Sequence, residues 1–150
     1  MTALTPPLDE TTTALLELLK GAGRPVYDGA FDGDPAAPPY WYSILYALPG
    51  GSADPMPDLD DDNDTVTALY QASTVSNRRD QAQLGARILH DRLLARTPAG
   101  GWLHALVLPA GWQCVGRRPA PELPGVERTG NPPRAVFTVP ARYFLTIAPA

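Results

Sequence analysis

The closing segment of the chain alternates apolar and polar residues with a period of two. Its apolar side consists of Ala135, Phe137, Val139, Ala141, Tyr143, Leu145 and Ile147. Thr138, Arg142 and Thr146 fall on the other side. This is the pattern of a strand with one buried face, so other parts of the chain must cover that face. Pro140 lies inside the run and predicts an edge position, a bulge or a break into two strands.

Three further segments predict strands. The segment from Thr65 to Val75 alternates in the same way, with one apolar face. Residues 40–48 are aromatic and aliphatic on both faces, which is typical of a central strand, and the Pro-Gly-Gly sequence at 49–51 should end it. A short strand is expected near Trp112 to Arg117.

Two segments with helical spacing can cover the apolar face of the predicted strands. The first should begin at Thr5, an N-cap followed by two prolines, and run to about Lys20. The second should be capped by Asn77 and present small and aliphatic residues to the sheet. Gly85 inside this second helix costs up to about 1 kcal/mol relative to alanine. Its presence indicates a close approach between helix and sheet.

Long loops should separate these elements, because 18 prolines and 13 glycines gather between the apolar runs. Residues 52–64 form an acidic segment that we expect to be mobile, and residues 118–134 form a Pro/Gly-rich loop. The 150 residues are enough for one core. The sequence therefore predicts a single α+β domain over 1–150, with two helices packed on a mixed or mainly antiparallel sheet of about four to five strands.

Composition argues against several classes of function. A net charge of −4 disfavours tight binding of nucleic acid. Two distant histidines and the single Cys114, expected to be a small buried hydrophobe, do not make a zinc site. No segment reaches the roughly 20 apolar residues that span a bilayer. The glycine motifs of nucleotide-binding loops are absent, and the Asp-rich run lacks the glycine and glutamate of an EF-hand. We expect no cofactor, no metal and no membrane association.

Nucleophilic catalysis is the remaining chemistry to consider. His90 could partner Ser43, Ser73 or Cys114, since such groups are assembled in space and not in sequence. Nothing in the sequence supports that assembly, and the carboxylates concentrate in a loop where acid–base geometry is hard to maintain. The chain is therefore not expected to be an enzyme.

The order of short motifs carries a resemblance to a known family. A helix leads to Val26-Tyr27-Asp28-Gly29, then to a strand that begins Pro39-Tyr40-Trp41. A second strand ends in Gln71-Ala72-Ser73-Thr74-Val75-Ser76, directly before Asn77-Arg78-Arg79-Asp80-Gln81-Ala82 and a long helix. A late Gly111-Trp112 strand and the closing strand complete the order. From about Leu15 to Ala148 this arrangement resembles the tail terminator family of siphoviruses, the long-tailed bacteriophages, especially those of actinobacterial hosts.

The resemblance implies a structural virion protein, assembled in the host cytoplasm and placed at the junction of head and tail. Such a subunit would form a homohexameric ring that caps the tail tube and stops its polymerisation. Its partners would be other copies of itself, the tail tube protein and a head-side connector protein, and genome DNA would pass through without specific binding. A ring built by head-to-tail contacts uses two different patches on each subunit.

Four residues are candidates for contacts between subunits or with partners. Arg78 and Arg79 start a helix, where positive charge is unfavourable to the helix dipole, so a carboxylate from a partner is expected there. Trp41 and Trp112 could anchor an interface, with core packing as the alternative for each. The acidic loop could line the lumen of the ring and repel phosphates, or could simply be solvated. Its carboxylates are those of Asp54, Asp58, Asp60, Asp61, Asp62 and Asp64.

Two other functions stay open. The first is another neck or connector component of the same particle. The second is a small hydrolase or ligand-binding domain that uses the apolar surface around Tyr40, Trp41, Tyr42 and Tyr46. A closed pocket with converging polar groups would favour the second, whereas an exposed aromatic face would favour the ring.

Overall fold

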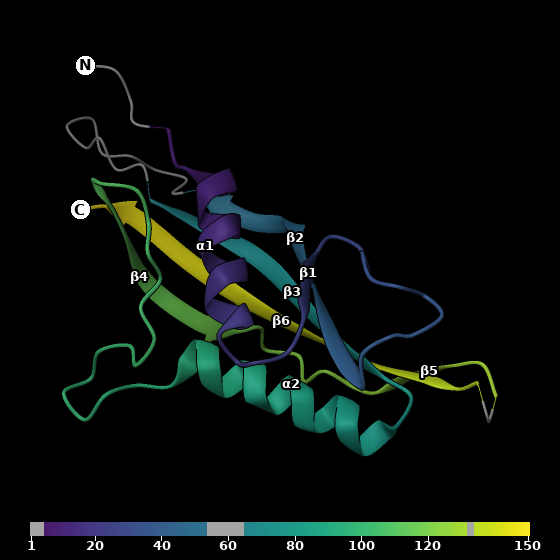
Figure 1. The fold of residues 1–150 in the computed structure, drawn as a ribbon. Helices are drawn as coiled ribbons and strands as arrows, with labels where there is room; N and C mark the ends of the chain where they lie inside the picture. Colours follow the sequence, from purple (N-terminus) through teal and green to yellow (C-terminus); the bar gives the residue numbers. More distant parts are fainter. Residues whose placement is uncertain (1–4, 54–64, 132–133) are drawn as a thin grey trace.

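Two helices cover one face of a six-stranded sheet in the computed structural model, which describes residues 5–53, 65–131 and 134–150 (Figure 1). In chain order the elements are α1 (Leu8–Lys20), β1 (Val26–Asp28), β2 (Trp41–Ala53), β3 (Val66–Ser76), α2 (Arg79–Leu94), β4 (Trp112–Pro119), β5 (Glu127–Thr129) and β6 (Val136–Pro149). The strand order is β1-β2-β3-β6-β4, with β5 also paired to β6. Among the strand pairs of the described residues, only β1 with β2 is parallel. The expected α+β fold is confirmed, with one or two strands more than the sequence predicted.

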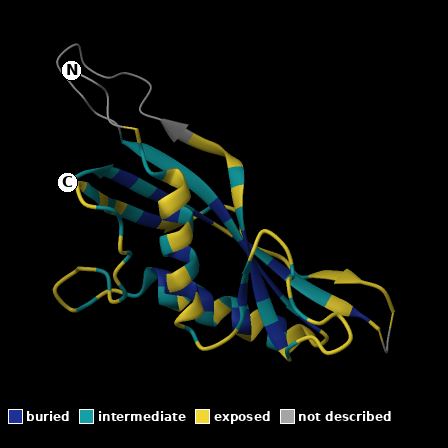
Figure 2. Ribbon diagram, turned by 45° about the horizontal axis from the view of Figure 1, so that its top comes forward, coloured by how far each residue is buried: buried dark blue, intermediate teal, exposed yellow. Residues whose placement is uncertain are grey.

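The core lies between the helices and the covered face of the two central strands, β3 and β6. Tyr70 pairs with Tyr143 and Ala72 with Ala141, and all four side chains are buried there. Figure 2 shows the buried segments of the sheet and of the helices in dark blue. The apolar alternation of the closing segment is thus confirmed from 139 to 147, where every second residue is buried. Helical leucines complete the core from above: Leu15, Leu18, Leu19, Leu89 and Leu93.

Pro140 lies on an interior strand, not at the edge of the sheet. The backbone N–H of Ala120 donates to the carbonyl of Arg142 (2.9 Å), so the polar backbone groups of residue 142 point away from β3. Because these directions alternate along a strand, the nitrogen of Pro140 points the same way. On that side β4 pairs with residues 143–149 and β5 with residues 136–138. Pro140 therefore faces the gap between two partner strands, where no donor is needed.

The expected end of β2 at Pro49-Gly50-Gly51 is wrong. The strand continues to Ala53, and a register shift between Leu48 and Ser52 takes up the tripeptide as an irregularity. Gly50 has a φ of 106°, which favours glycine. A Cβ on Gly51 would collide with the carbonyl oxygen of Thr67. The two glycines therefore bend the strand without ending it.

Both helices begin later than predicted, and neither has a side-chain cap. α1 begins at Leu8 after Pro7, because a residue that precedes a proline is disfavoured in the helical conformation. α2 begins at Arg79 with Arg78 as its N-cap. Asn77 does not cap it, because β3 runs on to Ser76, whose hydroxyl accepts the N–H of Arg78 (3.2 Å).

Arginine side chains from other elements donate hydrogen bonds to backbone carbonyls at the C-terminal ends of both helices. Arg92 Nε donates to the carbonyl of Leu18 at the end of α1 (2.7 Å). Arg117 Nη1 donates to the carbonyls of Leu93, at the end of α2 (3.1 Å), and of His104 (2.9 Å). Positive charge at a helix C-terminus is favourable to the dipole. Burial of Arg117, which is 6% exposed, lowers the pKa of its guanidinium.

Gly85 marks the predicted close approach of helix and sheet. A Cβ there would lie 2.8 Å from Thr74 Cγ2 and 2.9 Å from Trp41 Cε3. These distances are shorter than real Cβ contacts, so only glycine lets α2 lie this near β2 and β3. The prediction from the isolated glycine is confirmed.

The two predicted loops have different outcomes. Segment 118–134 contains the end of β4 and the whole of β5, so it is not loop throughout. Of the acidic segment, residues 54–64 lie outside the described residues. Within the described part of the chain, no helix is long and apolar enough to cross a membrane.

Candidate functional site

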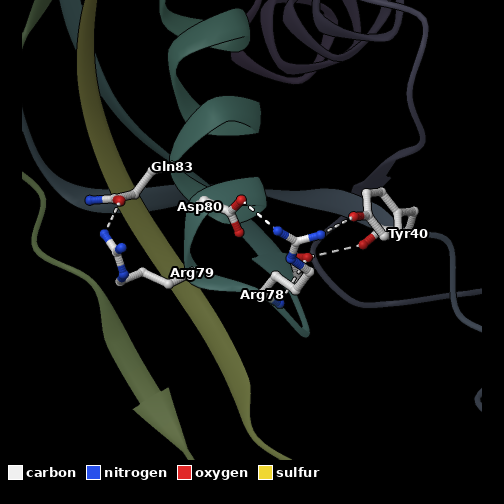
Figure 3. A network of polar contacts seen from close by, with 6 residues as sticks. Tyr40, Arg78, Arg79, Asp80 and Gln83 are labelled. Atoms are coloured by element: carbon white, nitrogen blue, oxygen red, sulfur yellow. Dashed lines mark hydrogen bonds and ion pairs between the residues drawn. The ribbon is translucent and has the colours of Figure 1, made fainter.

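The start of α2 carries an exposed polar network (Figure 3). Arg78 Nη1 donates to the hydroxyl of Tyr40 (3.1 Å), and Nη2 donates to Asp80 Oδ2 (2.8 Å). The negative charge of Asp80, followed by the hydrogen bond that Arg78 donates to Tyr40, raises the pKa of the Arg78 guanidinium. Because a guanidinium has five N–H donors, this arginine keeps donors for another acceptor.

Arg79, the second predicted arginine, has a neutral partner. Its Nη1 donates to Gln83 Oε1 one turn along α2 (2.9 Å) (Figure 3). Both arginines are exposed, so each is available to a carboxylate from outside the chain. Arg78 and Arg79 thus lie at the same end of the domain, but their guanidinium groups point apart, toward Tyr40 and toward Gln83 (Figure 3).

An apolar groove of about 350 Å³ opens beside this network. Tyr40, which is 47% exposed, connects the two, since it forms part of the groove wall and accepts the bond from Arg78. Ser76 and Asn77 are the polar residues of the lining. The remaining lining residues are Pro38, Pro39, Tyr42, Val75 and Val136. We call this cavity the Tyr40 groove.

The two predicted tryptophans lie elsewhere. Trp41 is only 3% exposed and packs beneath α2 against Gly85, with the Arg24 guanidinium 5.5 Å from its ring. It is a core residue, the alternative that the sequence left open. Trp112 is half-buried at the far end of the sheet, where β4 pairs with Pro149. The structure therefore does not join either tryptophan to the arginines in one surface.

Sequence reasoning missed an aromatic cluster on the uncovered face of the sheet. The rings of Tyr27, Phe31 and Tyr42 meet with centroids 4.6 to 5.8 Å apart. Tyr27 follows the buried Val26 in β1 and so faces the other way, which β-strand alternation could have indicated. The place of Phe31 depends on the loop after β1, which no periodicity predicts. This cluster supports the side of the Tyr40 groove on which Tyr42 lies.

The residues considered for nucleophilic catalysis are all engaged elsewhere. His90 Nδ1 is bonded to the Tyr143 hydroxyl (3.0 Å), and burial raises the pKa of Tyr143 to about 12. Ser43 is bonded to Thr74 (2.9 Å), and the half-buried Cys114 donates to the carbonyl of Gly116 (3.4 Å). Cys114 is thus less buried than expected. None of the described hydrogen bonds joins His90 to a candidate nucleophile.

The four aromatic residues proposed for a ligand pocket are divided between the two faces of the sheet. Trp41 lies on the covered face, while Tyr42 and Tyr46 alternate with it on β2. Among the described residues, no group of three His, Cys, Asp or Glu side chains could hold a metal ion.

Comparison with known proteins identifies the fold. The sequence matches no protein-family model and no curated protein. The structure is similar to a chain of the solved structure described as "Virion of native gene transfer agent (GTA) particle", with a TM-score of 0.61 and 15% sequence identity. The match covers 94% of this chain and 96% of that one. The two chains therefore share their fold over nearly their whole lengths.

Proposed function

We propose that this protein is a phage tail terminator, a structural virion subunit that forms a hexameric ring on the end of the tail tube. The observation that carries the proposal is the shared fold with a chain of a phage-like virion particle over 94% of the sequence. The independent support is the motif order along the chain, in which β3 leads directly into the Arg78-Arg79-Asp80 start of α2.

The distribution of surface features suits a subunit that is surrounded by others. Exposed large apolar residues lie on several separate segments and do not converge on one enclosed pocket. Scattered apolar residues are common on monomers, so the support comes from the exposed Tyr40 bonded to Arg78, since aromatic residues and arginine are enriched at interfaces. Head-to-tail contacts between neighbouring subunits would use two such patches.

In this proposal the ring also contacts the tail tube protein on one side and a head-side connector protein on the other, at the head–tail junction of the virion. The acidic segment, with Asp54, Asp58, Asp60, Asp61, Asp62 and Asp64, would face the lumen. A negative lumen repels phosphates and lets DNA pass without specific binding. An actinobacterial siphovirus as source rests on the motif resemblance alone.

The test is assembly on tail tubes. Tube protein from the same genome is polymerised with and without the purified 16.1 kDa chain, and tube lengths and ends are measured by electron microscopy. We expect shorter tubes that carry a ring at one end, and a species near six times the subunit mass bound to them. Tubes that keep their length and bare ends would contradict the proposal.

The alternative within the same particle is another neck component. It differs in its partner, because it would bind the head-side connector complex and leave tube length unchanged. The same preparation, mixed separately with tubes and with connector complexes, distinguishes the two roles by which one it sediments with.

A further inference from the structure

Leu123 is the most exposed large apolar residue among the described parts of the chain, at 94%. It lies in the turn of residues 120–126 that connects β4 to β5, between Pro121 and Pro124. Prolines fix φ and reduce the freedom of such a turn, so the leucine is held outwards at little entropic cost. We call residues 121–124 the Leu123 turn.

A carboxylate precedes this leucine. Glu122 is exposed, and neither of the two ion pairs in the described residues, Lys20–Glu17 and Arg78–Asp80, involves it. The turn thus presents one apolar side chain and one unpaired negative charge side by side.

The Tyr40 groove has the complementary pair of features. Its wall is formed mainly by proline, tyrosine and valine side chains, and its volume of about 350 Å³ exceeds that of a leucine side chain. At its rim, the Arg78 guanidinium donates one N–H group to Tyr40 and one to Asp80, and its other three N–H groups can donate to another acceptor. The guanidinium of the next residue, Arg79, points away from Tyr40 toward the neutral Gln83 (Figure 3).

The two features lie on opposite sides of β6. β4 and β5 both pair with the side of β6 away from β3, and the Leu123 turn connects them there. Most of the residues that line the Tyr40 groove belong to β2, β3 and the residues next to them. These two strands lie on the other side of β6 (Figure 1). A contact between these two surfaces is therefore heterologous, and repetition of it produces a ring or an open chain of subunits.

We propose that the Tyr40 groove receives the Leu123 turn of a second copy of this chain, with Glu122 of that copy paired to Arg78. The number of copies and the closure of the ring rest on the proposed function, but the pairing of the two surfaces does not. The occupant is identified by complementarity, since an apolar side chain with one carboxylate meets an apolar groove with a guanidinium group at its rim.

Cysteine cross-linking tests the contact directly. Leu123→Cys and Pro38→Cys are combined in a Cys114→Ser background, on the purified protein alone and on tail tubes. Oxidation should give a ladder of covalent multimers on a non-reducing gel, whereas either single cysteine should give no species beyond a dimer.

A doubly substituted protein that assembles but gives no ladder would overturn this contact and leave the ring itself intact. A protein that forms the ladder but never caps tubes would keep the contact and overturn the terminator function. A protein that neither assembles nor cross-links would overturn both.

Substitutions measure the two parts of the contact. Burying a leucine is favourable enough that Leu123→Ser should weaken each contact by about tenfold or more, whereas Leu103→Ser, at another exposed loop leucine, should leave assembly unchanged. Arg78→Glu should also weaken assembly, and Glu122→Arg in the same chain should restore it. Asp80→Ala is the control, because it breaks the internal ion pair and keeps the arginine. Unchanged assembly of Leu123→Ser, with circular dichroism showing a folded chain, would overturn the proposal.

Discussion

Phe144 and Leu145 are neighbours on β6 and point to opposite faces of the sheet. Leu145 is fully buried under the helices, whereas Phe144 is half-buried on the uncovered face, with the Arg118 guanidinium 4.4 Å from its ring. The covered face is stabilised by close apolar packing, and the uncovered face by hydrogen bonds and ring contacts across strands, such as Thr67–Thr146 and Gln71–Arg142. The folding energy should therefore be concentrated on one face, which leaves the other free for contacts with partners.

The largest difference in the free energy of unfolding should appear between alanine substitutions of these two neighbours. Leu145→Ala leaves a cavity in the core and should lower the free energy of unfolding by about 3 kcal/mol. Phe144→Ala should cost about 1 kcal/mol, because the ring is already partly hydrated. Urea unfolding followed by circular dichroism measures both at one pH. Equal losses would show that the uncovered face contributes as much to folding as the covered one.

Gly85→Ala should give the next largest loss in the free energy of unfolding. A Cβ would overlap Thr74 and Trp41, and overpacking of this kind costs about 2 kcal/mol even though alanine is the better helix former. Gln83→Ala, two residues away on the exposed side of α2, is the matched control and should change stability little. If Gly85→Ala is stabilising, α2 does not lie as near to Trp41 as described.

The strands were more predictable than the turns around them, for a physical reason. Alternation along β3 and β6 reports directly which face is buried, and the isolated Gly85 reports a close approach, so both could be inferred from local sequence. The start of α2 could not, because β3 continues to Ser76 through pairing with Phe137, a residue 61 positions away in the chain. The same holds for β2, whose continuation past Gly51 depends on its pairing with Thr67 and Val66.

The candidate site was predicted only in part. The unfavourable charge at a helix start pointed to Arg78 and Arg79; both are exposed, and Arg78 alone of the two contacts Tyr40. Tyr40 and Val136 could not be joined to them from the sequence, since the groove is assembled from segments about 100 residues apart. For Trp41 the sequence allowed either an interface anchor or a core residue, and its burial beneath α2, against Gly85, shows a core residue.

Alkaline pH should weaken the covered face. Burial raises the pKa of Tyr143 to about 12, against 10.0 for the unperturbed group, so the unfolded chain loses its proton first as pH rises. The stability from this tyrosine is complete below about pH 10 and declines between about pH 10 and 12, by up to about 2 kcal/mol. Unfolding free energies measured at pH 9, 10 and 11 should fall in the wild type and fall less in Tyr143→Phe. Parallel curves for the two proteins would remove Tyr143 as the cause.

The smallest effect should come from the polar contacts of the uncovered face. Arg142 is exposed and its Nε donates to Oε1 of the half-buried Gln71 (3.1 Å). Such a solvent-accessible bond contributes little, because water replaces it at almost no cost. Arg142→Ala should therefore lower the free energy of unfolding by no more than about 0.5 kcal/mol, measured by the same urea titration. A loss comparable to that of Gly85→Ala would mean that this face is part of the folding core, and that a partner on it would compete with folding. A small loss means that the uncovered face can exchange its own contacts for those of a neighbour without unfolding the subunit.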